Sequence, residues 1–158
     1  AAGNHWPLQL NVSEARRMAG GFIFTERDIV TDRIKQDAIA VARGGLALRS
    51  VQRYAEAGGA AKNEGAVELP AGAFQVPYRV LLPKRKDASN LLVAVCVSAS
   101  HVAAPALRDE AVLMALGHAA GIAAAMALEG GTAVQDIDTG QLQRRLREQG
   151  ALLDMPEQ

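Results

Sequence analysis

The longest apolar region of the chain lies between residues 90 and 130, and its pattern changes half-way along. Leu91 to Val97 is an unbroken apolar run of strand length, rich in valine. Such a run is typical of a parallel strand covered on both faces, so we expect a buried strand here. From Asp109 onward, apolar residues recur at three- and four-residue steps, which predicts a long helix. The residues that set this period are Leu113, Leu116, Ala120 and Ala124.

Two glycines, Gly117 and Gly121, lie inside this predicted helix. Glycine within a helix costs up to about 1 kcal/mol relative to alanine, so a reason for its presence is needed. We expect another backbone or a ligand to approach the helix closely at these positions. The alternative is a crossing of small-residue helices with no cofactor involved.

Weaker patterns predict the elements of the first half. Asn11 or Ser13 is suited to cap a short helix that ends near residue 20. Thr25, followed three residues later by Asp28, predicts the start of a second helix that runs to about Arg43. The interval that follows, up to residue 70, shows no sustained period and predicts a loop.

The later part of the chain predicts one strand and one helix besides the central pair. Apolar residues alternate from Phe74 to Leu82, and Pro77 indicates an edge strand or an irregular entry. Leu142 and Leu146 mark the inner face of a last helix that runs to about residue 149. Its expected cap is Asp138 or Thr139, and its expected stop is Gly150.

Composition narrows the class of partner. The 158 residues include 17 basic and 17 acidic side chains, so charge gives no argument for nucleic acid or an anionic membrane. Aromatic residues make up 4%, which leaves little for base stacking. The apolar run from Ala111 to Leu128 is long enough to raise the question of a membrane span. Because it is mostly alanine and glycine with His118 inside, we expect a helix packed in protein instead.

The side chains that carry hydrolytic or metal chemistry are sparse. The one cysteine, Cys96, cannot form an intrachain disulfide, and three histidines without paired spacing indicate no metal site. The chain also contains no GxSxG nucleophile motif.

Several sequence blocks, in order, resemble a known family. VCVSASH, then Arg108 and MALGHAAGIAAAMAL, is similar to the C-terminal signature of FAD-dependent oxidoreductases of the glutathione-reductase-like superfamily, in the branch loosely labelled xanthan-lyase-like. Further blocks match over nearly the whole chain: LNVSEARRMAGGFIFTERDI, SVQRY, KNEG, VPYRVLLPK and VQDIDTGQLQRRLREQGALL. What they resemble is only the C-terminal part of such an enzyme.

The glycine-rich phosphate-binding motif of that superfamily is missing from this sequence. FAD binding there begins with a strand, a GxGxxG turn and a helix whose N-terminus faces the pyrophosphate. None of the glycine pairs follows an apolar strand and opens a helix with the third glycine; the pairs begin at Gly20, Gly44, Gly58 and Gly130. We therefore expect a partner chain or domain that carries GxGxxG and shares the FAD.

The resemblance implies a fold and an activity. The fold would be α/β, the C-terminal part of a Rossmann-like FAD-binding fold, with its last sheet strand and flavin-side helix. Residues 1–74 would form a substrate-side helical segment and loop, and residues 75–158 the C-terminal part of the FAD-binding domain. The activity implied is hydride transfer from a small-molecule substrate to FAD, with the turn at Glu110–Leu116 facing the flavin. The cofactor-binding residues implied are Ser98, Ser100, Arg108, Met114, Ala115, Leu116 and Gly117.

His101 is the candidate catalytic residue, because a histidine beside a ligand-binding strand end can move a proton or hydrogen-bond a flavin. The alternative is a histidine that bonds a nearby carbonyl and shapes its loop. Arg108 has the same two readings, since it can bind a carboxylate or phosphate or form a structural salt bridge.

Departures from the family pattern keep two other functions open. Relatives often carry Asp-Ser-His where this chain has Leu48-Arg49-Ser50, which favours a different substrate or a degenerate, inactive member. The other alternative is a non-catalytic interaction module that oligomerises through its Gly/Ala-rich helix.

Overall fold

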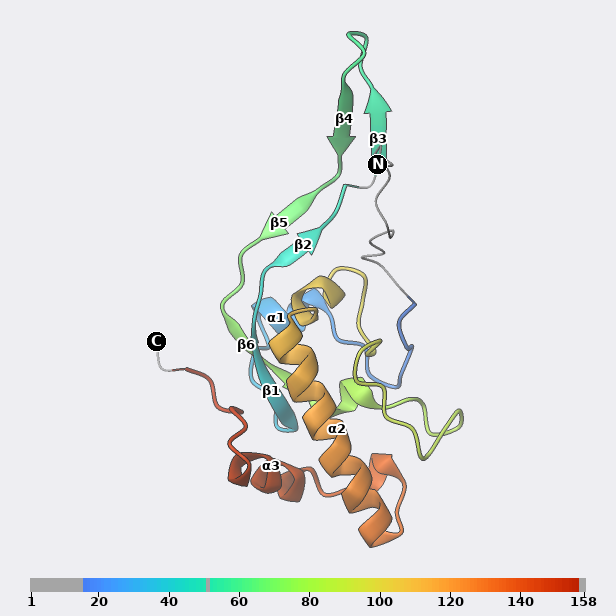
Figure 1. Cartoon of the computed structure of the whole chain (residues 1–158), viewed down its shortest axis with the longest axis vertical. Helices are drawn as coiled ribbons and strands as arrows, with labels where there is room; N and C mark the ends of the chain where they lie inside the picture. The colour runs from blue at the N-terminus through green and yellow to red at the C-terminus, as the bar shows by residue number, and fades with distance from the viewer. Residues whose placement is uncertain (1–15, 51, 157–158) are drawn as a thin grey trace, which may run out of the picture.

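The computed structural model describes residues 16–50 and 52–156 (Figure 1). Its centre is an antiparallel pair of strands, β1 (Ala38–Arg43) and β6 (Ala73–Pro77), which pair as Arg43 with Ala73 and Ala38 with Pro77. The short helix α1 (Glu26–Val30) contacts β6, and the long helix α2 (Glu110–Gly130) packs on β1. The class is mixed α/β, as predicted, but the described sheets are small and antiparallel.

The prediction of a helix from Thr25 to Arg43 was right only at its start. Thr25 caps α1, and its backbone N–H and hydroxyl both donate to the Asp28 carboxylate at 2.8 Å. The helix ends at Val30, a turn and irregular residues follow, and the last part of the expected helix, Ala38–Arg43, forms β1. Ile39 and Val41 suit a strand as well as a helix, so pairing with the distant β6 decides the outcome.

The expected loop at residues 44–70 is a long two-stranded ribbon that projects from the body (Figure 1). Strand β2 (Leu46–Leu48) pairs with β5 (Val67–Leu69), and β3 (Gln52–Ala55) pairs with β4 (Ala61–Glu64). Every residue of β3 and β4 is exposed. Neither strand therefore has the alternation of apolar and polar residues that predicts a half-buried strand. The loop prediction was wrong for that reason.

The predicted buried strand at Leu91–Val97 is also wrong. These residues form an irregular segment in which Val95 is 66% exposed and Cys96 is exposed. A parallel strand needs hydrogen-bonded neighbours, and beside this segment the described chain offers one parallel bridge, between Phe24 and Ala99. The last strand of a Rossmann-like sheet is therefore not formed, and the expected strand at Phe74–Leu82 stops at Pro77, before the 3-10 helix η1 (Tyr78–Leu81).

The long helix is confirmed, with Asp109 as its N-cap and Gly131, at φ +60°, as its C-cap. One face is buried, and its residues recur every three or four positions: Val112, Leu116, Ala119, Ala123, Met126 and Ala127. The opposite face is apolar as well but exposed; we call it the open face, and it consists of Ala111, Met114, Gly117, Gly121, Ala125 and Leu128. The buried side of α2 is thus turned by about one position from the predicted one.

The last helix is confirmed almost as predicted. Helix α3 (Thr139–Glu148) begins at Asp138, whose carboxylate accepts from the backbone N–H groups of Gly140 and Gln141. Leu142 and Leu146 are fully buried, and Gly150 follows the helix at φ +82°. The expected first helix, from Asn11 or Ser13, lies largely outside the described residues, and residues 16–20 are not helical.

The predicted division at residues 74 and 75 falls inside β6, which pairs with β1 across it. Both parts also contribute to one hydrophobic core, in which Phe24 and Phe74 lie with their ring centroids 5.9 Å apart. The assignment of residues 1–74 to a substrate side and of residues 75–158 to an FAD-binding domain stays a prediction.

Helix α2 is the one described helix whose length and composition would allow it to cross a membrane, with a mean hydropathy of 1.9. A third of that window is buried within the protein. Core helices of soluble proteins pass the same test, so this feature alone is weak evidence for a span.

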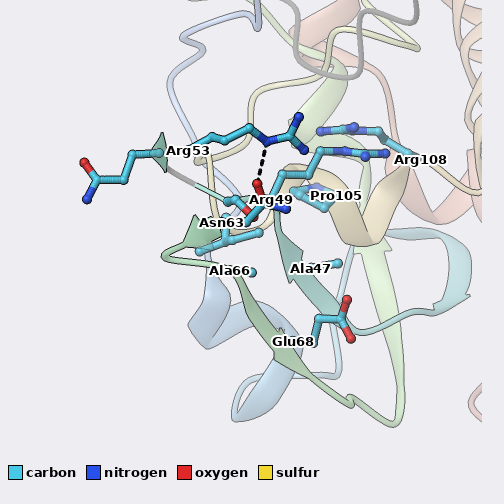
Figure 2. A pocket seen from close by; sticks show the side chains of 11 residues that line it. Ala47, Arg49, Arg53, Asn63, Ala66, Glu68, Pro105 and Arg108 are labelled. Carbon is cyan, nitrogen blue, oxygen red and sulfur yellow. Dashed lines mark hydrogen bonds between the residues drawn. The ribbon is translucent and has the colours of Figure 1, made fainter. Parts of the chain in front are cut away.

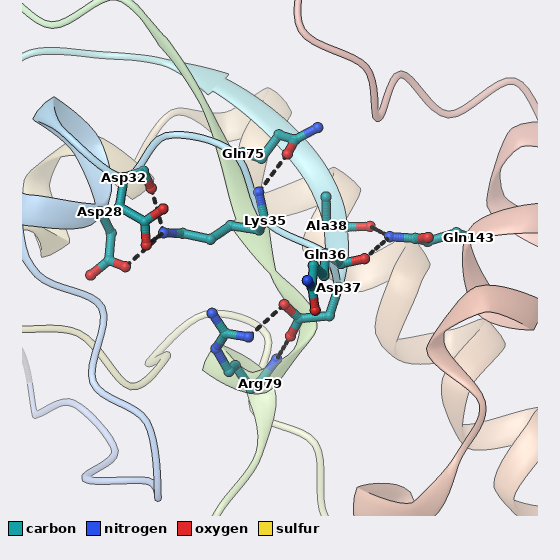
Figure 3. A network of polar contacts seen from close by, with 9 residues as sticks. All are labelled: Asp28, Asp32, Lys35, Gln36, Asp37, Ala38, Gln75, Arg79 and Gln143. Atoms are coloured by element: carbon teal, nitrogen blue, oxygen red, sulfur yellow. Dashed lines mark hydrogen bonds and ion pairs between the residues drawn. The ribbon is translucent and has the colours of Figure 1, made fainter.

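A buried ion pair fixes α1 against the central strands (Figure 3). The Lys35 side chain is 1% exposed, and its ammonium lies 2.9 Å from the Asp28 carboxylate and 2.6 Å from that of Asp32. The Lys35 backbone N–H donates to the side chain of Gln75 in β6, which in turn donates to the Leu153 carbonyl. One cluster therefore joins α1, β6 and the C-terminal segment.

This cluster predicts a loss of stability in acid. Burial alone would raise the pKa of Asp28, but hydrogen bonds from Lys35 and Thr25 outweigh it and hold this pKa below its usual value. The unfolded carboxyl has a pKa of about 3.9. Because folding lowers the pKa of Asp28, its ionised carboxylate stabilises the fold fully at pH values above the unfolded pKa. This stabilisation is lost as the pH falls through the folded pKa.

We expect Asp28→Asn to lower the free energy of unfolding at neutral pH by about 1–3 kcal/mol. The variant should also lose less stability than the wild type between neutral pH and pH 3, as measured by urea denaturation. Asp154→Asn, which removes an ion pair on an exposed carboxylate, is the control and should change stability by less than about 0.5 kcal/mol. Equal acid sensitivity of Asp28→Asn and wild type would contradict this account.

Candidate functional site

The Ser98–His101 segment is held beside residues 22–24 by backbone hydrogen bonds. Phe24 N–H donates to the Ser98 carbonyl at 2.9 Å, and Ser100 N–H donates back to the Phe24 carbonyl at 2.8 Å. Ser98 N–H donates to the Val80 carbonyl at 2.9 Å. This segment and the turn after it lead into η2 (Ala104–Leu107), from which Arg108 and Asp109 open α2.

Ser98, a predicted cofactor-binding residue, is fully buried. Its hydroxyl accepts from Gly20 N–H at 3.0 Å and donates to the Phe22 carbonyl. A side chain at position 20 would stand 2.5 Å from the Leu82 carbonyl, so glycine is required for this approach. In the structure, the Ser98 side chain thus ties its own segment to the backbone of residues 20–22.

Ser100 and His101 lie nearer the surface. The Ser100 hydroxyl accepts from Ala103 N–H at 3.2 Å, which starts the turn toward η2. His101 is exposed at the next position. Both residues lie on the loop that precedes α2.

The predicted residues at the start of α2 point to different sides. Leu116 is fully buried and Ala115 half-buried, so Leu116 belongs to the core. Met114 is 76% exposed, and the space in front of Gly117 is open, since a side chain there would meet no heavy atom of the described chain within 4 Å. Of the predicted stretch, Met114 and Gly117 can therefore contact a ligand from the open face.

The first turn of α2 carries both a helix dipole and acidic side chains. The Asp109 carboxylate accepts from Ala111 N–H at 2.9 Å, and Glu110 follows it. Amide groups at a helix N-terminus attract negative charge, and Asp109 already uses part of that capacity. Further along the helix, His118 lies 2.7 Å from the Gln149 side chain, so it ties α2 to the end of α3.

A cavity of about 860 Å³ lies between the ribbon and η2 (Figure 2). Arg108, which the sequence singled out, lines it together with residues of β2, β3, β4 and β5. Arg49 and Arg53 are also in its wall, and the Arg53 guanidinium donates to the Asn63 side chain at 2.6 Å. Sequence reasoning missed both arginines as site residues, because only the pairing of the ribbon brings them to Arg108.

Comparison with known proteins decides the family. A family model described as FAD dependent oxidoreductase matches residues 1–146. The chain belongs to the FAD-dependent oxidoreductase family. No curated protein and no solved structure matches it with significance. The predicted family is thus confirmed at this level, and its xanthan-lyase-like branch stays a prediction.

Membership of the FAD-dependent oxidoreductase family implies FAD as the cofactor, and the described residues fit one part of it. A side chain added at Gly117 or Gly121 would meet no heavy atom of the described residues within 4 Å, so a flat group can approach the helix there. For the pyrophosphate, the described residues contain no strand, glycine turn and helix in succession. No group of three or more histidine, cysteine, aspartate or glutamate side chains that could hold a metal occurs in the described part of this family member.

The geometry at Ser98 generates a test of its role. Ser98→Ala leaves the buried Gly20 N–H without its acceptor, so we expect the free energy of unfolding of the flavin-free protein to fall by about 1–3 kcal/mol. Ser89→Ala, at an exposed position, should change it by less than about 0.5 kcal/mol. If Ser98→Ala kept full stability without flavin but lost flavin binding, Ser98 would be a ligand contact and its structural role would be refuted.

Proposed function

We propose that this chain forms one wall of the flavin site of an FAD-dependent oxidoreductase that transfers hydride from a small-molecule substrate to FAD. The observation that carries the proposal is the open face of α2, which is an exposed apolar surface. The family to which the chain belongs implies FAD as the cofactor. An uncovered apolar strip of this length is unfavourable in water unless something packs on it.

The chain's own residues have distinct roles in this proposal. When bound, FAD supplies the hydride acceptor. Backbone N–H groups in the first turn of α2 would stabilise negative charge on the bound ring, and Met114 and Gly117 would line it and exclude water. Ala115, Leu116 and Ser98 support this wall from behind.

The loop before α2 supplies the polar groups of the proposed site. Ser100 and Arg108 are its proposed hydrogen-bond donors, and His101 is the proposed proton carrier. The exposure of His101 supports this, because a proton carrier needs access to substrate or solvent.

The proposal requires a second unit for the dinucleotide. A domain or chain with a GxGxxG turn would bind the pyrophosphate and cover the rest of the open face, from Gly121 to Leu128. The absence of that motif from the sequence supports this division of the cofactor site.

The protein, purified natively with any companion chains and supplied with FAD, should show flavin absorption in the visible. Gly117→Leu places a side chain in the open space beside the helix, so we expect it to lower flavin content at least tenfold, about 1.4 kcal/mol. The helix itself should not be weakened, because leucine is the better helix former.

The matched control is Gly58→Leu at the exposed tip of the ribbon, where a side chain would also meet nothing within 4 Å. It should keep the flavin content of the wild type. A wild-type protein without flavin, even after FAD is added with its companion chains present, would refute the proposal.

The open face also favours a second candidate, a non-catalytic module that oligomerises through α2. Gly121, Ala125 and Leu128 extend the strip well beyond the reach of a flavin ring at the first turns. Two copies of such a face can pack closely because small residues let backbones approach.

For that candidate, Gly117→Leu combined with Gly121→Leu should reduce the mass of the particle measured by light scattering, in a protein that binds no flavin. Gly58→Leu should leave the mass unchanged. An assembly state that survives the double substitution counts against association through α2.

A further inference from the structure

Three arginines gather in the cavity between the ribbon and η2. Arg49 follows β2, Arg53 lies in β3 and Arg108 follows η2, so three separate elements deliver them. In Figure 2 their side chains extend toward one another above Pro105, whereas Glu68 lies apart from them. The cavity therefore has a strongly basic side.

Two of these arginines, Arg49 and Arg53, carry a charge that no carboxylate in the described ranges neutralises. Four other described arginines pair with carboxylates at 3.0 Å or less, among them Arg79 with Asp37 and Arg145 with Glu129. Within residues 16–50 and 52–156, no ion pair joins Arg49 or Arg53 to a carboxylate. Like charges that share one cavity repel each other, and a bound anion would relieve that repulsion.

The cavity is also built in part before any ligand arrives. Arg53 pairs directly with Asn63 across the ribbon, and the Asn63 side chain holds its Nε at 2.6 Å. This contact leaves the two terminal nitrogens of the Arg53 guanidinium to face a ligand. A guanidinium presents two parallel N–H donors, a fork that matches carboxylate and phosphate oxygens.

We propose that this cavity is a binding site for a small molecule that carries a carboxylate or phosphate group, held by Arg49, Arg53 and Arg108. Its volume of about 860 Å³ falls within the range of small-molecule sites. Ser50, Gln52 and Asn63 line the same cavity and supply neutral hydrogen-bonding groups for the rest of the ligand.

The site also bears on the proposed function, although anion binding does not depend on it. Arg108 directly precedes Asp109, the N-cap of α2. If α2 faces the flavin, the cavity adjoins the flavin-facing end, and the substrate oxidised there is an anion; this last step rests on the proposed function.

The test is isothermal titration of the whole chain with inorganic phosphate and with succinate, at low ionic strength. We expect at least one of them to bind, and the tighter one identifies the anionic group. Arg49→Gln and Arg53→Gln should each weaken that binding about tenfold, since each removes hydrogen bonds to a charged group. Added salt should weaken it as well, because the arginines are exposed.

Arg144→Gln is the matched control, because Arg144 is an exposed arginine on α3 outside this cavity. It should bind as the wild type does. Arg49→Lys keeps the charge but loses the fork, so its affinity should lie between those of wild type and Arg49→Gln. Circular dichroism should be used to check that each variant is folded. If Arg49→Gln does not fold, Arg53→Gln on the exposed ribbon provides the test.

No binding of either anion by the wild type, or affinities unchanged in both glutamine variants, would overturn the proposal. Flavin absorption, measured on the protein purified with any companion chains and supplied with FAD, separates the two hypotheses. Anion binding without flavin refutes the proposed flavin wall and leaves this site intact. Flavin without anion binding refutes this site alone.

Discussion

The packing of α2 on β1 is the constraint on which the rest of the structure depends. The helix is apolar on all sides, and a two-stranded sheet can cover only one of them. Ala119 and Ala123, both fully buried, allow the helix backbone to lie close to the strand. That contact organises the core around Phe24, Phe74 and Leu116, and it leaves Met114 at 76% and Leu128 at 85% exposure on the other side. Contact with water disfavours such a strip, so we expect another surface to cover it.

The same reasoning explains the irregular segment at residues 91–97. Its apolar side chains have the composition of an interior strand, yet Leu91 and Val95 are exposed and the backbone has almost no strand partners. Both this segment and the open face of α2 are therefore apolar surfaces that lack a covering element among the described residues. The second unit that we propose for the dinucleotide would pair with this segment and pack on the helix.

How far the sequence predicts the structure depends on whether the deciding interaction is local. Helices α2 and α3 were predicted because their caps, period and terminal glycines lie within the elements themselves. Strand β1 was mistaken for helix, since its partner β6 lies about 30 residues later and its Ile and Ala residues fit either state. The ribbon was missed because both of its faces are wet, which removes the alternation of apolar and polar residues. Arg108 was found as a candidate because it lies directly before the predicted helix. Arg49 and Arg53 were not found, because only the pairing of the ribbon strands brings them to the cavity.

The position of Arg108 links the two proposed surfaces through one electrostatic argument. A cation beside a helix N-terminus opposes the positive end of the helix dipole, which disfavours it by a few tenths of a kcal/mol to about 1 kcal/mol. Asp109 and Glu110 offset part of this cost, but Arg49 and Arg53 add two further positive charges in the same cavity. Arg49 and Arg53 have no carboxylate partner within residues 16–50 and 52–156, so an ion pair there does not offset their charge beside the positive end of the helix. An anion bound between Arg49, Arg53 and Arg108 would be attracted by their charges and by the dipole, which supports the anion site proposed above.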